Sequence, residues 1–145
     1  MRRKTLSVKI GKVFIGSDHS IKTQSMTTAS TMDTDKSVDE AIRIIQAGGK
    51  LVRFTAPNIN EAKNLLNIKD ALVAKGYDDP LVADIHFTPN AALEASKIVD
   101  KVRINPGNYV DKKKFEVKEY DDKSYQDELL NCLLYTSDAA DEPVC

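Results

Sequence analysis

Two arginines, an aspartate and a histidine each interrupt a short apolar run of the chain. Asp84 and His86 stand in the run LVADIHF at 81–87, while Arg53 and Arg103 stand in the runs LVRFT and KVRI. A carboxylate in a buried strand is costly unless a cation pairs with it. Guanidinium groups match the oxygens of phosphates and carboxylates in a bidentate way. Two arginines that converge on one pocket therefore predict an anionic ligand, with a diphosphate as the natural candidate.

These residues also have plainer interpretations. Asp84 paired with an arginine would form a structural ion pair. Asp84 and His86 alone fall short of a full set of metal ligands, so no metal site is predicted. The turn from Asn105 to Asn108, NPGN, comes just after Arg103 and would by itself be only a turn. At the C-terminal end of a strand its backbone amides could also cradle phosphate.

The elements that must position these residues alternate between strand and helix. The pattern at 5–16, with a Gly-Lys pair in its middle, predicts a short β-hairpin. Strands are expected at 22–26, 50–55, 81–87 and 101–105, with helices at about 37–47, 59–75 and 89–99 between them. This alternation predicts an α/β fold with a parallel sheet and right-handed crossovers. A further short helix is expected at 124–130.

Local signals mark where the three main helices begin. Ser37 and Glu40 form an S-x-x-E pattern that predicts a capping box. Asn58 is the expected N-cap of the second helix. Thr88 is expected to cap the third helix, with Pro89 at its first position. Each helix is thus expected to start a few residues after the preceding strand.

Side chains along a strand alternate between its two faces. In the run 81–87, the face expected to pack on helices carries Leu81, Ala83, Ile85 and Phe87. The opposite face carries Val82, Asp84 and His86. Arg53, Arg103 and Asn105 likewise point away from their apolar neighbours, and Gln24 and Ser25 occupy the first strand. These polar residues come near the C-terminal ends of their strands, where parallel α/β folds place their binding sites.

Composition excludes several classes of partner. The chain has 145 residues and a formal net charge of −1, which indicates no nucleic-acid partner and no membrane surface. It has no apolar run of about 18 residues that could span a membrane. The N-terminus lacks the apolar segment of a secretory signal. A cytoplasmic bacterial protein is therefore expected.

The last residues break with the pattern before them. The segment CLLYTSDAADE, which starts at Cys132, resembles the in-frame translation of a sequencing-library adapter. The expected division is a natural portion at 1–131 and a non-native tail at 132–145. Both cysteines, Cys132 and Cys145, lie in that tail, so they predict neither a disulfide nor a metal site.

Four segments, QSMTT, LVRFT, LVADIHF and VRINPGN, occur in an order that resembles a known enzyme family. The family is the 4-hydroxy-3-methylbut-2-enyl diphosphate synthases, iron–sulfur oxidoreductases of the non-mevalonate isoprenoid pathway. The likeness covers residues 2–131, and its most specific part is the pairing of ADIHF with RINPGN. The stretch that begins at Asn108 resembles the longer, three-domain form of the enzyme.

The resemblance implies the N-terminal part of a (β/α)8 TIM barrel, preceded by the short hairpin. It implies binding of 2-C-methyl-D-erythritol 2,4-cyclodiphosphate, which is opened reductively to the linear allylic diphosphate. The electrons would come from ferredoxin or flavodoxin through a [4Fe-4S] cluster, held in a C-terminal domain by three cysteines and a glutamate. This chain lacks that domain, and a barrel typically needs about 250 residues. The chain alone is therefore expected to bind no cofactor and to be inactive.

The resemblance also assigns roles residue by residue. The implied substrate-binding residues are Gln24, Arg53, Arg103 and Asn108. The implied catalytic-pocket residues are Asp84, His86 and Asn105. Two alternatives remain. One is a pterin- or phosphate-binding barrel of the dihydropteroate-synthase type, without a cluster, and the other is a non-catalytic α/β module that binds a ligand. Three cysteines in the sequence beyond Asn131 would separate the first alternative from the synthase.

Overall fold

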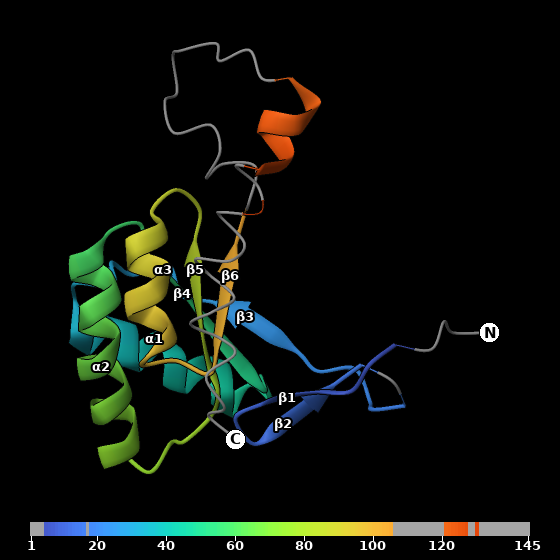
Figure 1. Ribbon diagram of the computed structural model, residues 1–145. Helices are drawn as coiled ribbons and strands as arrows, with labels where there is room; N and C mark the ends of the chain where they lie inside the picture. The colour runs from blue at the N-terminus through green and yellow to red at the C-terminus, as the bar shows by residue number, and fades with distance from the viewer. Residues whose placement is uncertain (1–4, 17, 106–120, 128–129, 131–145) are drawn as a thin grey trace.

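Three strand–helix units and a final strand form a parallel sheet with helices along one face (Figure 1). The computed structural model describes residues 5–16, 18–105, 121–127 and 130. Its elements are β1 (Val8–Ile10), β2 (Val13–Ile15), β3 (Gln24–Met26), α1 (Thr34–Gln46), β4 (Leu51–Thr55), α2 (Ile59–Ala74), β5 (Leu81–Ile85), α3 (Pro89–Ser96) and β6 (Lys101–Ile104). The expected short helix near 124–130 is present at 122–127.

The order of the strands separates two kinds of α/β architecture. The sheet runs β3-β4-β5-β6, and every neighbouring pair is parallel. In a doubly wound sheet the strand order reverses, and helices then cover both faces. Here each strand lies beside the next one in the chain and the helices share one face, as in successive units of a (β/α)8 barrel. The prediction of an α/β fold that forms the N-terminal part of a barrel is confirmed.

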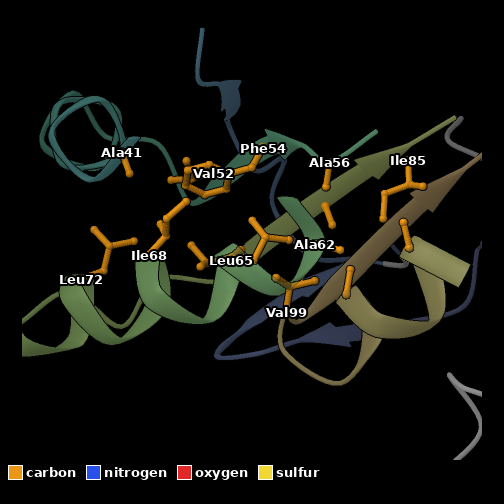
Figure 2. Close-up of a cluster of buried hydrophobic side chains, with 14 of the residues drawn as sticks. Ala41, Val52, Phe54, Ala56, Ala62, Leu65, Ile68, Leu72, Ile85 and Val99 are labelled. Atoms are coloured by element: carbon orange, nitrogen blue, oxygen red, sulfur yellow. The ribbon is translucent and has the colours of Figure 1, made fainter. Parts of the chain in front are cut away.

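The main hydrophobic core lies between the sheet and the helices (Figure 2). The sheet contributes fully buried side chains that alternate along β4 and β5, namely Val52, Phe54, Ala83 and Ile85. Helix α2 contributes Ala62, Leu65, Ile68 and Leu72. These helical residues are spaced three or four apart, so they form a single apolar stripe. The alternate side chains of these strands point to the other face of the sheet.

The hairpin covers the N-terminal end of that other face. Ile10 packs there against Leu51 and Val82 and forms a second, smaller core. Gly11 turns the hairpin with a φ of +52°, and a Cβ at this position would lie 2.9 Å from the Asp100 Oδ1 atom. Only glycine suits such a backbone against such a neighbour. One sheet face is therefore apolar at its N-terminal end and open towards its C-terminal end.

The predicted capping box of α1 is wrong. The helix starts three residues earlier, and its N-cap is Asp33, whose side chain accepts a hydrogen bond from the amide of Lys36. Ser37 is buried inside the helix and donates its hydroxyl to the Ser30 carbonyl at 3.0 Å. Glu40 binds the preceding loop instead of the helix start. The S-x-x-E pattern failed because an aspartate four residues upstream caps the helix first.

The second helix follows the prediction closely. Asn58 caps α2 by accepting hydrogen bonds from the amides of Asn60 and Glu61, at 3.0 and 3.1 Å. The helix ends at Ala74, one residue before the predicted end. This cap fixes the turn that follows β4, and with it the distance between that strand and its helix.

The strand predicted at 81–87 is shorter in the structure. Strand β5 ends at Ile85, and the chain bends at 86–87 towards α3. Phe87 is therefore exposed, and the prediction that it packs against the helices is wrong. Thr88 occupies the N-cap position, but its hydroxyl donates to the Pro57 carbonyl at 2.8 Å instead of capping the helix. The helix then ends at Ser96, three residues before the predicted end.

Leu65 and Leu66 are neighbours on α2 with opposite environments, 0% and 48% exposed. We expect Leu65→Ala to lower the free energy of unfolding by about 2–5 kcal/mol, because it leaves a cavity under the sheet. Leu66→Ala is the matched control and should change it by less than about 0.5 kcal/mol. Urea unfolding followed by circular dichroism measures both. Equal losses would contradict the packing of α2 described above.

Candidate anion-binding site

A single buried carboxylate holds two arginines on the open face of the sheet. The Asp84 side chain is 2% exposed. Its Oδ1 accepts a hydrogen bond from Arg103 Nη1 at 2.9 Å, and its Oδ2 lies 3.3 Å from Arg53 Nη2. Each carboxylate oxygen thus faces one guanidinium group. The two arginines, from strands on either side of β5, are brought together by this one residue.

The sheet register explains why these three side chains meet. Asp84 of β5 lies beside Arg103 of β6 and beside Thr55 of β4. Arg53 is two residues before Thr55 and therefore points to the same face. Its long side chain spans the remaining step along the strand. The predicted convergence of Arg53, Asp84 and Arg103 on one face is thus what the register produces.

His86 joins this group from the bend after β5. Its Nε2 atom contacts Arg103 Nη1 and lies 3.4 Å from Asp84 Oδ1. The Nε2 atom thus faces both the guanidinium group and the carboxylate, so His86 belongs to the same group of side chains at the C-terminal edge of the sheet.

The charges of the group favour an anion. Two guanidinium groups and one carboxylate leave one net positive charge. Arg53 and Arg103 are 30% and 43% exposed, so donors on both remain accessible at the sheet edge, whereas the carboxylate is covered. Within the described part of the chain, no three His, Cys, Asp or Glu side chains are placed to hold a metal ion. The arrangement therefore suits a phosphate or carboxylate ligand better than a cation.

The other predicted site residues lie at different distances from this group. Asn105 follows β6 directly and is half-buried, two residues beyond Arg103 on the same face. Gln24 begins β3 and lies beside Leu51, at the apolar end of the sheet. It lines a groove of about 520 Å³ between β3 and α1, which Met26 also lines. The structure therefore does not bring Gln24 to Asp84, and Asn108 lies outside the described residues.

One contact to Arg53 was missed by sequence reasoning. Met26 ends β3 beside Arg53, and its Sδ atom accepts a hydrogen bond from Arg53 Nε at 3.3 Å. Strand alternation places Met26 on the sheet face that carries the arginines. A methionine in a strand is ordinarily interpreted as a packing residue, so the sequence alone does not reveal its contact with an arginine.

The loop between β3 and α1 is fixed beside the site. The Glu40 carboxylate accepts hydrogen bonds from the amides of Thr28 and Ala29 at 2.6 and 3.0 Å, and from the Thr28 hydroxyl at 2.8 Å. The Thr27 amide donates to the Arg53 carbonyl at 2.9 Å. The loop is thus tied to a helix on one side and to β4 on the other, so it forms a defined wall next to the arginine.

These bonds also perturb the Glu40 carboxyl. The Ala29 amide, followed by the amide and hydroxyl of Thr28, lowers the pKa of Glu40 below its usual value. Each of these donors favours the ionised form of the carboxyl group. The anchoring of the loop therefore depends on an ionised Glu40.

Comparison with known proteins assigns a family to this arrangement. The sequence model of one protein family, the GcpE TIM-barrel domain, matches residues 5–124, which is most of the chain. The match includes all four strands of the parallel sheet and the three helices that cover it.

Curated relatives share about half of their aligned residues with this chain. A 4-hydroxy-3-methylbut-2-en-1-yl diphosphate synthase (flavodoxin) of Chlamydia abortus is 54% identical over 130 residues, which cover 89% of this chain and 22% of that protein. The chloroplastic ferredoxin form of Oryza sativa is 48% identical over 129 residues, covering 88% and 17%. The chain thus spans about a fifth of the length of the curated relatives it matches.

A solved structure supports the fold alone. A crystal structure of phospho-2-dehydro-3-deoxyheptonate aldolase from Thermotoga maritima aligns with a TM-score of 0.55 and 14% identity, covering 94% of this chain and 43% of that one. At that identity only the barrel architecture is shared. Separately, none of the helices among the described residues is long and apolar enough to cross a membrane.

Asp84→Asn should lower the free energy of unfolding by about 1–3 kcal/mol, because it leaves two guanidinium groups without their shared anion. The cost stays below that of a fully buried pair, because solvent reaches both arginines. Asp78→Asn is the matched control. Asp78 is exposed and pairs with Lys12 at the other end of the sheet, so its loss should change the unfolding free energy much less than the loss of Asp84. Urea unfolding compares the two, and equal effects would contradict the central role of Asp84.

Glu40→Gln should remove a pH-dependent part of the stability. Since folding lowers the pKa of Glu40, its ionised form stabilises the fold above the unfolded-state pKa of about 4.3. That stabilisation is lost as the pH falls through the folded-state pKa. The difference in unfolding free energy between wild type and variant should therefore be constant at neutral pH and shrink below about pH 4. Urea unfolding at a series of pH values measures it. A difference that does not change with pH would show that the ionised carboxylate is not what holds the loop.

Proposed function

Because this chain belongs to the family of the GcpE TIM-barrel domain, we propose that it is part of the substrate-binding barrel of a 4-hydroxy-3-methylbut-2-en-1-yl diphosphate synthase. The proposed substrate is 2-C-methyl-D-erythritol 2,4-cyclodiphosphate, which this oxidoreductase of isoprenoid biosynthesis opens reductively. The observation that carries the proposal is the pair of arginines held by Asp84 at the open end of the sheet. It supplies cationic donors where a diphosphate would need them.

The proposed ligands of the diphosphate are Arg53 and Arg103. Their guanidinium groups carry five N–H donors each in a planar fork, and Asp84 engages only part of that set. The remaining donors match the phosphate oxygens of the substrate in geometry and charge. The single net positive charge of the group is then met by the negative charge of the diphosphate.

The substrate's hydroxyl groups have a different set of proposed partners. Asp84 is covered by both arginines, so its proposed role in the pocket is to hold them in place. His86 supplies an imidazole ring and Asn105 an amide as hydrogen-bonding groups for the hydroxyls. We propose these three as the catalytic-pocket residues. Gln24 and Asn108 are proposed as substrate-binding residues on the resemblance of QSMTT and VRINPGN alone.

Reductive ring opening also needs two electrons. The relatives carry flavodoxin and ferredoxin in their names, and we propose that the full-length product of this gene takes electrons from one of them. A [4Fe-4S] cluster would need cysteine ligands, and the described residues contain no group of side chains that could hold one. We therefore propose that cysteines elsewhere in the full-length protein hold the cluster. We further propose that the enzyme works in the cytoplasm.

The alternatives are less well supported. A barrel of the dihydropteroate-synthase type would also carry polar residues at strand ends, but the family match over residues 5–124 is to the GcpE barrel. A non-catalytic α/β module has no need for two arginines on one buried carboxylate. The curated relatives described above, moreover, are named as synthases in a bacterium and in a plant.

Arg103→Ala in the full-length protein should weaken binding of 2-C-methyl-D-erythritol 2,4-cyclodiphosphate by about 1–3 kcal/mol, the scale of lost charge-assisted hydrogen bonds. Isothermal titration calorimetry measures it. Arg103→Lys keeps the charge but loses the planar fork of donors, so its affinity should lie between those of the wild type and Arg103→Ala. Lys75→Ala is the matched control, since Lys75 is an exposed cation at the end of α2, on the helix side of the sheet, and it should bind like the wild type. Unchanged affinity in Arg103→Ala would remove Arg103 from the proposed ligands.

A further inference from the structure

Arg53 is held at two different atoms by two different kinds of partner. Its Nε donates to the Met26 sulfur at 3.3 Å, while its Nη2 forms the ion pair with Asp84. A guanidinium group is planar, so contacts at Nε and Nη2 together fix both its position and the orientation of its plane. The Nη1 atom, with two N–H donors, takes part in neither contact.

The chemical nature of the second partner matters. A thioether is a weak, uncharged acceptor. It therefore orients the guanidinium without cancelling its charge, whereas a second carboxylate would bring the net charge of the group to zero. Met26 is also partly exposed on the open sheet face, where a residue that served only for packing would leave apolar surface in contact with water.

We propose that Met26 is a positioning residue for anion binding: its sulfur orients the Arg53 guanidinium so that Nη1 presents both donors to a phosphate group of the ligand. This inference rests on the proposed function. It deepens that function by adding a residue that touches the arginine and not the substrate.

The register makes this role specific to one position. Met26 and Arg53 lie side by side in the parallel pairing of β3 and β4, so the sulfur reaches Nε directly across the strand gap. The Thr27 amide then bonds the Arg53 carbonyl, which locks the two strands at this level. The backbone therefore holds Arg53 Nε and the Met26 sulfur opposite each other before any ligand binds. Binding then costs the arginine side chain less conformational entropy.

The test separates an acceptor from a packing group in the full-length protein. Met26→Leu keeps the volume and removes the acceptor, and Met26→Gln keeps the length and restores an acceptor through its amide oxygen. We expect Met26→Leu to raise the Kd for inorganic pyrophosphate about three- to tenfold in calorimetry. Met26→Gln should stay within about threefold of the wild type. Met32→Leu is the matched control, on an exposed methionine in the neighbouring loop, and should leave Kd unchanged.

The possible outcomes are distinct. Tight binding by Met26→Leu with weak binding by Met26→Gln would show that Met26 acts by packing, and would overturn the inference. Weak binding by both variants would also overturn it, because an acceptor alone would then not suffice. If Arg103→Ala weakens binding while Met26→Leu does not, the proposed function stands and only the role of Met26 fails. Wild-type protein that binds neither pyrophosphate nor the cyclic diphosphate would overturn the proposed function itself.

Discussion

The buried carboxylate of Asp84 is the interaction on which the arrangement of the sheet face depends. A charge with 2% exposure would be strongly destabilising alone, and its cost is offset only if cations reach both oxygens. Arg53 and Arg103 meet that requirement from β4 and β6. The three strands must therefore be adjacent, parallel and in one register, because a slip of one residue would turn an arginine to the other face.

The two faces of the sheet have different tasks. The face towards the helices is apolar along β4 and β5 and supplies the main core, so it holds these strands against α2 whatever the other face carries. The other face changes along its length. At the N-terminal end Ile10 of the hairpin covers Leu51 and Val82, while at the C-terminal end Asp84 gathers the cations. The apolar part and the charged part of this face are thus only two residues apart along the same strands.

The sequence alone predicted the strands, the order of helices and the face that carries the polar residues, because these follow from alternation and periodicity within short segments. It was wrong where two local signals competed. Asp33 capped α1 before Ser37 could, and the bend after Ile85 turned Phe87 away from the core.

Contacts between distant segments were the part that local patterns could not reach. The sulfur of Met26 meets Arg53 only because β3 pairs with β4 in a particular register, and Glu40 meets Thr28 only because α1 folds back on its own preceding loop. Register and loop geometry are set by the whole fold. A pattern of residue types over ten or twenty positions does not contain them.

Burial of Asp84 destabilises the sheet face unless cations pair with it, and the same residue holds the two arginines in place. A buried aspartate requires cations as neighbours, and arginine is the cation whose five donors outnumber what one carboxylate oxygen can accept. Lysine could neutralise Asp84 equally well, but it presents a point charge without a planar fork to share between two partners. Under the proposed function, arginine at 53 and 103 meets two demands at once, since each guanidinium pairs with the carboxylate below it and keeps donors for the proposed anion above.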